Sequence, residues 1–565
     1  MNDTKRTIAA GLLIGLLTLF IPFYLRLIGI APEEDFSVSS SPPIEPLVRE
    51  APGDENLGST QERPIVSLLD NSVSSIDFSI ITDKYLASMS SLSGGSFLSF
   101  EINSLQKDGY RYKGGYNESG EYDPSADVNL MLSSPGPCSP CLSSENTLFD
   151  KPFELLSPSI SSGQIFNLYD SDSLVVKMRF FHNGYNIYKT TTFYADSYII
   201  KHDFIVDESP GSLFVLWNDG ILPTEKNLYE ELTYSSAYIG QSKEISDITL
   251  NASSLEDHIS KESFVGKTDW VAIRNKYFIN SFISSQATGG SLEGRSVNLS
   301  ADTFIPAYAV GLKFDSSSFS LNQFFGPLDV DIITSSNTYL DRVMNFGWLP
   351  IQPFSRSVLW ILKKLHLLGL NYGVILILFA FLIRIITGPL TKKSYQSTLK
   401  MQKIQPQMKK IQEKYKNDSQ RLNREMMNLY KTSGVNPLGG CFPMLVQMPL
   451  LFSLFIVFRS TIEFRGAPFF GWINNLSQPD TIFNLPFNVP IYGDQVAFLP
   501  IVLGVSMFLT QRLSMATMDK SQKPMMYMMS AFFFLLFNSF PSGLNLYYTI
   551  YNFLNYFQQK SLKGK

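Results

Sequence analysis

The chain has 565 residues, 44% of them hydrophobic, and a formal net charge of −4. This near-neutral average conceals two halves of opposite charge: residues 31–355 carry 42 acidic and 20 basic side chains, whereas residues 356–565 carry 7 acidic and 23 basic ones. The division argues against one compact domain, and because the basic half is also strongly apolar, it argues against DNA binding. Three cysteines, four histidines and the lack of HExxH or GxxxxGK[ST] motifs argue against a disulfide scaffold, a zinc centre or ATP use, so we expect no cofactor.

The first apolar run, residues 8–25, follows Lys5 and Arg6. About 18 apolar residues are enough to cross a bilayer, and no small-residue cleavage site follows them cleanly. We therefore predict an uncleaved transmembrane anchor over 1–30 with a cytoplasmic N-terminus; a cleaved secretory signal is the alternative. Residues 31–65 are rich in Ser, Pro and Glu, a composition that predicts a linker without a core.

Residues 66–340 have the pattern of an antiparallel β-sandwich. Runs rich in Val, Ile, Phe, Tyr and Thr alternate with turn dipeptides such as Asn183-Gly184, at roughly ten-residue spacing. The clearest predicted strands are 173–181, 185–194, 198–206 and 212–217. No long helical period precedes residue 335, and the domain shows no defensible catalytic constellation.

Cys138 and Cys141 lie in this domain as Cys-Ser-Pro-Cys. In an oxidising compartment we expect them to form a small local disulfide. A redox role is the alternative, but the surrounding sequence lacks the βαβ pattern that would support it.

Long apolar segments dominate the rest of the chain. Residues 357–368 place Leu, Ile and Trp around Lys363 and Lys364, which predicts an amphipathic helix at a membrane surface, within an interfacial region 341–371. Five apolar runs follow, each predicted to be a transmembrane helix: about 372–390, 438–458, 496–511, 525–540 and 543–557.

Basic residues gather on one side of these predicted spans. Segment 391–435 has eleven Lys or Arg against three acidic residues, and further basic residues stand in the turn 512–523 and the tail 561–565. The positive-inside rule places them in the cytoplasm and the acidic β domain in the periplasm. Counting six spans from a cytoplasmic N-terminus gives the same topology, with both termini cytoplasmic. The predicted fold class is therefore α+β, a polytopic helical membrane protein with a large periplasmic β-sandwich.

The cytoplasmic segment is predicted to form a helical hairpin, with helices 391–416 and 418–433 broken at Asn417-Asp418 and no proper apolar stripe. It is either a solvated hairpin attracted to anionic lipid or a docking site for ribosomal RNA, a targeting factor or an incoming chain. The candidate docking residues are Lys392, Lys393, Lys400, Lys403, Lys409 and Lys410.

Arg384 stands inside an apolar span, where a charge costs about 2.5–3.5 kcal/mol on insertion scales. No Asp or Glu lies in any predicted span to pair with it, so we infer a water-filled cavity around it. Snorkelling to the cytoplasmic interface is the alternative, because Lys392 is only eight residues further on. Other spans supply polar groups that either line this cavity or hold the helices together by hydrogen bonds. They are Gln447, Gln511, Asn545, Thr549 and Asn552.

Several motifs in this half resemble the signature of the YidC/Oxa/Alb membrane-protein insertase family. The longest is Asn436-Pro-Leu-Gly-Gly-Cys-Phe-Pro-Met-Leu-Val-Gln-Met-Pro449. Others are Asn371-Tyr-Gly373, Arg384 with Pro389-Leu-Thr391, Gln405-Pro406 and Phe540-Pro-Ser-Gly-Leu-Asn-Leu-Tyr-Tyr548. A large domain between the first two spans resembles the arrangement of the Gram-negative branch.

The resemblance implies a five-helix insertase core over 372–560 in a bacterial inner membrane, with a groove open to cytoplasm and lipid. It implies that Arg384 attracts acidic residues of the substrate and that Tyr548 contacts it; at a second contact position this chain has Ala380. The implied partners are nascent membrane proteins, the Sec translocon, the ribosome, the signal-recognition-particle receptor and the bilayer. The implied activity is insertion and chaperoning, without nucleotide hydrolysis or any other enzymatic reaction.

Two other classes of protein also combine membrane spans with charged residues or a periplasmic domain. A solute transporter would predict inverted repeats and broken half-helices, and no internal repeat is evident. A periplasmic binding protein that is merely anchored by helices would need neither Arg384 nor a basic hairpin.

Overall fold

A computed structural model describes residues 66–67 and 74–563 of the chain. Inside that range the description omits 118, 133–138, 145–146, 183, 208–210, 219, 252–254, 256–258, 301–302, 335–339, 436–441, 490–491 and 516–522. The predicted anchor at 1–30, the linker at 31–65 and Cys138 therefore lie outside the described residues.

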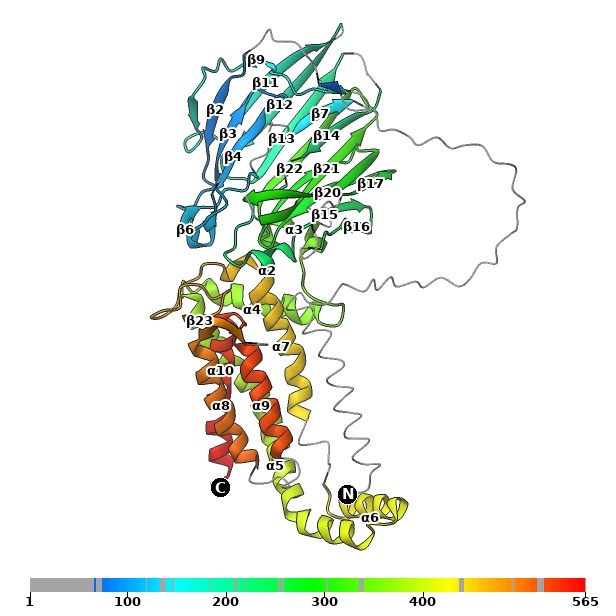
Figure 1. Cartoon of the computed structure of the whole chain (residues 1–565), viewed down its shortest axis with the longest axis vertical. Coiled ribbons are helices and arrows are strands. Elements are labelled where there is room, and N and C mark those ends of the chain that lie inside the picture. The colour runs from blue at the N-terminus through cyan, green and yellow to red at the C-terminus, as the bar shows by residue number, and fades with distance from the viewer. Residues whose placement is uncertain are drawn as a thin grey trace, which may run out of the picture.

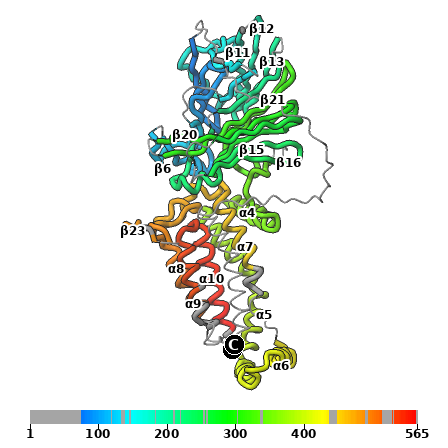
Figure 2. Tube along the Cα trace, turned by 45° about the vertical axis from the view of Figure 1, so that its right-hand side comes forward, coloured from blue at the N-terminus to red at the C-terminus, as the bar shows by residue number. Residues whose placement is uncertain are grey.

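The described chain forms a β-rich body stacked on a helical body (Figure 1). The order of elements explains this arrangement, because nearly all strands precede residue 328 and the long helices follow residue 351. In the turned view of Figure 2 the two bodies remain end to end, with α6 (Ser419–Thr432) at the end furthest from the strands.

Three sheets build the β domain. The nine-stranded sheet contains β9 (Glu154–Ser157), β11 (Ser173–His182), β12 (Tyr185–Tyr194), β13 (Ile199–Val206), β15 (Ser236–Gln241), β16 (Glu244–Ile248), β18 (Trp270–Arg274), β19 (Phe278–Ile283) and β22 (Ser318–Pro327). The seven-stranded sheet contains β1 (Val66–Ser67), β7 (Cys141–Ser144), β8 (Thr147–Leu148), β14 (Leu213–Trp217), β17 (Ile259–Val265), β20 (Gly289–Ser300) and β21 (Thr303–Phe314). The four-stranded sheet contains β2 (Asp77–Ile81), β3 (Tyr85–Ser90), β4 (Ser96–Ile102) and β10 (Gln164–Asn167). Two-stranded ribbons pair β5 (Lys113–Tyr116) with β6 (Tyr122–Asp127), and β23 (Thr481–Val489) with β24 (Gly493–Ala497).

The strand order of the largest sheet is β16-β15-β18-β19-β22-β13-β12-β11-β9, and every pairing in it is antiparallel. The four strands expected near 173–217 are confirmed within one residue at each end. The expectation of antiparallel pairing throughout is wrong at two places, because β1 pairs with β8 and β10 with β2 in parallel. A wholly antiparallel pattern cannot be read from sequence where a strand returns by a long connection.

Aromatic side chains form the core in which the three sheets meet. Trp217 of the seven-stranded sheet packs at 5.0 Å between ring centroids against Phe325 of the nine-stranded sheet. Phe325 in turn stacks at 4.3 Å on Phe100 of the four-stranded sheet. All three side chains are fully buried, so face-to-face packing of alternating inward residues produces the predicted sandwich.

The long helices match the predicted apolar segments. They are α4 (Gln352–His366), α5 (Tyr372–Lys414), α7 (Phe442–Ser460), α8 (Phe498–Met515), α9 (Lys523–Phe537) and α10 (Ser542–Lys563). Within the described residues only α5 is both long and apolar enough to cross a membrane, and shorter apolar stretches cover Gln447–Ser460 and Phe498–Arg512. At about 1.5 Å per residue, α9 is about 22 Å long, shorter than a hydrocarbon core of about 30 Å. The six-span arrangement and the domain boundaries remain predictions.

The hairpin differs from expectation in two respects. Its first arm is not a separate helix, because α5 runs without interruption through Pro389 and Pro406 to Lys414. The expected lack of an apolar stripe is wrong: Leu422 and Met426 of α6 are buried, as is Ile404 of α5. Leu422 and Met426 are four residues apart and therefore share one helix face. The break near Asn417-Asp418 is confirmed, and Asp418 caps α6 by accepting a hydrogen bond from the Arg421 amide at 2.9 Å.

Charged groups join the two bodies. Glu230, in the short helix α2 (Leu228–Leu232) of the β domain, accepts hydrogen bonds at 2.7 Å from both Lys276 Nζ and Arg459 Nε. Burial by itself raises the pKa of Glu230, but the two cations lower it to about 2. The carboxylate therefore stays ionised, and it links the β domain to the end of α7.

Candidate functional site

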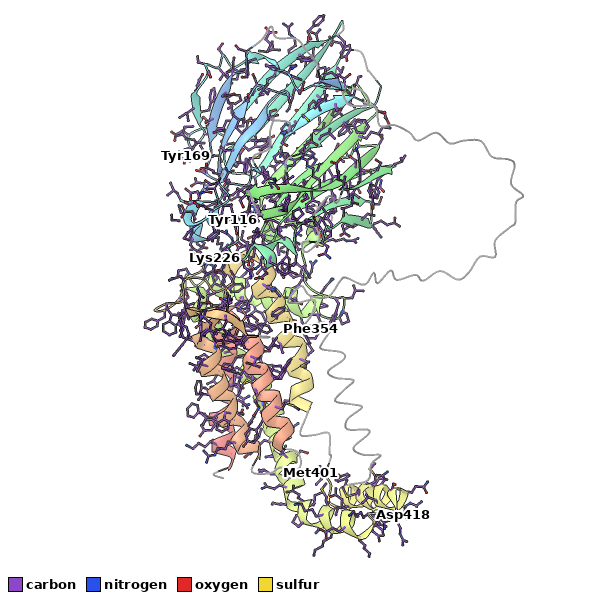
Figure 3. All side chains as sticks on the ribbon, viewed as in Figure 1. Tyr116, Tyr169, Lys226, Phe354, Met401 and Asp418 are labelled. Carbon is purple, nitrogen blue, oxygen red and sulfur yellow. The ribbon has the colours of Figure 1, made fainter. Side chains whose placement is uncertain are left out.

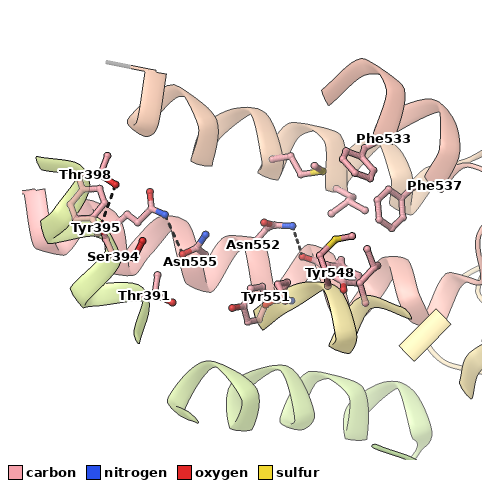
Figure 4. Close-up of a pocket in the computed structure, with 16 residues that line it drawn as sticks. Thr391, Ser394, Tyr395, Thr398, Phe533, Phe537, Tyr548, Tyr551, Asn552 and Asn555 are labelled. Atoms are coloured by element: carbon pink, nitrogen blue, oxygen red, sulfur yellow. Dashed lines mark hydrogen bonds between the residues drawn. The ribbon is translucent and has the colours of Figure 1, made fainter. Parts of the chain in front are cut away.

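A cavity of about 370 Å³ lies among α5, α7, α8, α9 and α10 (Figure 4). Its polar side chains gather near one end, where Thr391, Ser394, Tyr395 and Thr398 of α5 lie beside Asn555 of α10. Apolar side chains line the other part: Met448, Leu451, Leu503, Met507, Phe533 and Phe537. The cavity therefore grades from hydroxyl and amide groups to an apolar surface.

One face of α10 provides much of the polar wall. Tyr548, Asn552, Asn555 and Gln559 are separated by four, three and four residues, which aligns them along one side of a helix. Asn552 is oriented by a hydrogen bond from its side-chain amide to the Tyr548 carbonyl at 2.9 Å. The sequence thus builds a polar stripe into a helix that is otherwise rich in aromatic residues.

Arg384 lies beside this cavity and is 8% exposed. Its Nη2 donates hydrogen bonds to the side-chain oxygens of Asn555, at 3.0 Å, and Gln558. The guanidinium carbon lies 5.5 Å from the centre of the Tyr551 ring, within range of a cation–π interaction. In the described part of the chain no carboxylate lies within ion-pair distance of Arg384, and its Nε and Nη1 have no hydrogen-bond partner. The charge is therefore held by neutral amides and an aromatic ring.

The predicted groove residues separate into two groups. Gln447, Tyr548 and Asn552 line the cavity, as does Asn555, one of the two amides that bind Arg384. Gln511, Asn545 and Thr549 do not. Gln511 accepts a hydrogen bond from the Ser530 hydroxyl, and Asn545 donates to the carbonyls of Phe537 and Phe540 at 3.1 and 3.3 Å. Thr549 is buried and does not line the cavity, and its hydroxyl has no hydrogen-bond partner among the described residues.

Sequence reasoning missed several residues of the site. Of the two amides that bind Arg384, Asn555 lies near the end of the last apolar run and Gln558 just beyond it, where amide side chains usually face solvent. The hydroxyl residues of α5 were counted with the cytoplasmic hairpin. The spacing of these residues could have indicated the site. Thr391, Ser394 and Thr398 are separated by three and four residues, so they lie on one face of a helix.

The six candidate docking lysines, Lys392, Lys393, Lys400, Lys403, Lys409 and Lys410, are all exposed along α5 beyond its apolar part. Their docking role stays a prediction. Cys141 is disulfide-bonded and buried, and the side-chain amide of Asn218 lies 3.8 Å from its sulfur. The partner cysteine lies outside the described residues, so the pairing with Cys138 stays a prediction. In the same described ranges, no group of three or more His, Cys, Asp or Glu side chains is placed to hold a metal ion.

Comparison with known proteins identifies relatives over both bodies. Residues 363–565 match the family described as 60Kd inner membrane protein, and residues 159–361 match the family described as YidC periplasmic domain. The chain is 40% identical over 384 residues to the membrane protein insertase YidC of Prosthecochloris aestuarii, covering 65% of this chain and 64% of that one. It is 41% identical over 357 residues to that of Chloroherpeton thalassium, covering 61% and 60%. The matched region therefore spans less than two thirds of the length of these relatives.

A crystal structure described as an active YidC insertase with its first transmembrane domain resolved is 16% identical to this chain. It aligns over 84% of this chain and 90% of its own, with a TM-score of 0.33, which is too low to support an argument.

Proposed function

Because this chain belongs to the YidC family of membrane-protein insertases, we propose that it inserts nascent membrane proteins into the bacterial inner membrane and helps them fold. The observation that carries the proposal is a cavity with a polar end, lined by five helices, with a buried arginine bound at its edge by amides rather than carboxylates. Such a site has the chemistry to receive a polar segment of a second chain.

Partitioning drives insertion in this account. Moving a Leu-rich helix of about 20 residues into lipid releases on the order of 6–12 kcal/mol. The barrier is the polar flank that must cross with the helix, and a polar cavity shortens the apolar part of that path. Nucleotide hydrolysis is not needed, because the free energy comes from the inserted helix itself.

Arg384 would select among these flanks. A carboxylate that enters the cavity competes with the amide oxygens of Asn555 and Gln558 for the guanidinium. The bonds to the amides already involve the charged guanidinium, but a carboxylate adds an opposite charge and can pair with it through two oxygens, so an acidic tail gains by the exchange. We propose that Gln447, Tyr548 and Asn552 contact the same segment, since they line the cavity.

The proposed function also implies a membrane topology and partners for the rest of the chain. We propose that the β domain is periplasmic, that both termini are cytoplasmic and that five helices of the core and the N-terminal anchor span the membrane. The exposed lysines of α5 would then meet the ribosome, the signal-recognition-particle receptor or anionic lipid on the cytoplasmic side. We propose that the protein acts alone or with the Sec translocon.

Depletion and complementation test this function. Cells depleted of the protein should accumulate uninserted small membrane proteins with short periplasmic tails, and the unaltered gene should restore insertion. Arg384→Ala should insert acidic-tailed substrates roughly tenfold less well while neutral-tailed ones change little, because a charge-assisted bond contributes about 1.5–3 kcal/mol. Arg384→Lys, which keeps the charge, is the matched control and should restore most of the difference. Normal insertion after depletion would contradict the proposal.

A further inference from the structure

A second cavity, of about 620 Å³, lies where the β domain meets the helical body. It is lined by the segment around η1 (Gly109–Tyr112), by residues at the start of α3 (Val330–Thr334), by α4 and by η3 (Ile462–Phe464). Figure 3 places Phe354 of α4 at this level, between the strands and the long helices. The two cavities share no lining residue, so this one is separate from the cavity beside Arg384.

Charges of both signs line this second cavity. The acidic residues are Asp108, Asp329, Asp331 and Glu463, and the basic residues are Arg111, Arg356, Lys363 and Lys364. Lys363 Nζ lies 3.1 Å from Asp329, 2.7 Å from Asp331 and 3.3 Å from Glu463. The His366 ring joins them through Asp108 at 3.1 Å and stacks on Tyr372. A cavity lined by both acidic and basic side chains suits a ligand that carries a positive and a negative charge.

Two buried side chains of opposite charge keep atoms without hydrogen-bond partners here, although Arg111 Nη2 donates to the Tyr372 hydroxyl at 3.4 Å and lies 3.7 Å from Asp108. Glu463 is 1% exposed, and although Lys363 is close, neither carboxylate oxygen has a hydrogen bond of acceptable geometry. Arg111 is 9% exposed, and its Nε has no acceptor among the described residues. A buried acceptor or donor without a partner is costly, more so when it is charged. The cavity thus needs one N–H donor for Glu463 and one acceptor for Arg111.

The rim of the cavity is apolar and faces outward. Trp360 and Leu367 both line it, and they are 61% and 72% exposed. Phe354 and Leu368 of the same region are also exposed, whereas Val358, Leu359 and Leu362 of α4 are buried against the protein. Tryptophan beside an apolar helix face is typical of the headgroup level of a bilayer. The mouth therefore opens where acyl chains end and headgroups begin.

We propose that this cavity binds the headgroup of an amine-bearing zwitterionic phospholipid, such as phosphatidylethanolamine, from the periplasmic leaflet. The ammonium donates to Glu463, the phosphate accepts from Arg111 and the exposed Lys364, and the acyl chains lie along Trp360 and Leu367. Phosphatidylcholine lacks N–H donors, and phosphatidylglycerol has no ammonium group to neutralise Glu463. A soluble aminoalkyl phosphate lacks the acyl chains that the rim would contact. The proposal does not depend on insertion activity.

The proposed preference for phosphatidylethanolamine can be measured by the retention of lipids on the purified protein. The purified full-length chain, in detergent with equimolar phosphatidylethanolamine, phosphatidylcholine and phosphatidylglycerol, is examined by native mass spectrometry. We expect one phosphatidylethanolamine to be retained about tenfold over phosphatidylcholine, the ratio that one charge-assisted bond supports. Glu463→Gln should bring that ratio close to one. Lys364→Gln should weaken retention of both zwitterionic lipids alike, because it removes a phosphate contact.

Lys261→Gln, an exposed position on the distant strand β17, is the matched control and should keep the preference. Equal retention of the two zwitterionic lipids by the unaltered chain would overturn the proposal, even if Glu463→Gln failed to fold. So would a preference for phosphatidylglycerol, or a preference that survives Glu463→Gln. Displacement of the lipid by an equal concentration of soluble phosphoethanolamine would overturn the assignment to a lipid.

Discussion

Arg465 and Glu225, 240 residues apart in sequence, form a buried ion pair between the helical body and the β domain, with Nε 2.6 Å from Oε1. Their side chains are only 2% and 4% exposed. The same guanidinium donates to the backbone carbonyls of Gly114 at 3.0 Å and Thr224 at 2.8 Å. This charge is fully ligated, and it holds the two bodies in one orientation.

Breaking this pair should detach or destabilise the β domain. Arg465→Met leaves Glu225 as a buried charge without its partner, and such a loss costs about 3–5 kcal/mol. We expect a clearly lower thermal unfolding midpoint for the purified chain, followed by fluorescence of the buried Trp217 and Trp270. The control is Arg179→Met, which removes an exposed pair with Glu154 and should change the midpoint little. Equal midpoints for the two variants would refute this role of Arg465.

Lys189 should make the stability of the β domain depend on pH. It is 2% exposed, lies 5.6 Å from the centre of the Phe204 ring, and has no acidic partner in the described part of the chain. Burial lowers the pKa of Lys189 to about 7, whereas the unfolded chain has an ordinary lysine pKa of about 10.4. Between these values the unfolded state binds more protons, so stability rises with pH and the cost of Lys189 is greatest below pH 7.

Lys189→Met should therefore raise the free energy of unfolding at pH 6, by up to about 4 kcal/mol, and raise it much less near pH 10. Burial, and then the charge of Lys189, lower the pKa of the nearby His202 to about 3, so that ring is neutral at both pH values in the unaltered protein. Denaturant unfolding at the two pH values measures the difference. A gain that is the same at both, or a loss at pH 6, would contradict the assignment.

How much of this structure was predictable depends on how local each signal is. The strands near 173–217 and the helices after residue 351 follow from apolar period and turn residues, which act within a few positions. The placement of Arg384 inside an apolar run was equally local. Its amide partners, Asn555 and Gln558, were not predictable, because only the packing of α10 against α5 brings them to the arginine.

The contacts between the β domain and the helical body could not be predicted from the sequence pattern. Arg465 stands in a short loop after an apolar run, where a cation usually faces solvent. Its ligands come from two distant segments of the β domain, 111–114 and 224–225. The sequence pattern likewise gives no indication that Arg111 and Glu463 are buried. Charge totals predicted that the halves occupy different environments, but they could not show that buried ion pairs join them.

The helical hairpin formed by the end of α5 and by α6 should depend on the apolar contact between its arms. Leu422→Asp places a charge at a position that is 5% exposed, so α6 should separate from α5 and the connection at 415–418 should become open to protease. We expect trypsin to cut there about tenfold faster, which corresponds to about 1.4 kcal/mol of lost packing. Met427→Asp, a similar change at a 56% exposed position of the same helix, should leave the rate unchanged. Similar cleavage rates for the two variants would show that the apolar contact at Leu422 does not hold the arms together.

The most direct test of the central claim is photo-cross-linking from two positions of α8 to a ribosome-stalled nascent membrane protein. Met507 lines the polar cavity, whereas Val505, two residues away on the same helix, is 53% exposed on its outside. If nascent chains pass through the cavity, a photoreactive residue at 507 captures the stalled chain and one at 505 captures little. Equal capture from both positions, or stronger capture from 505, would contradict the account.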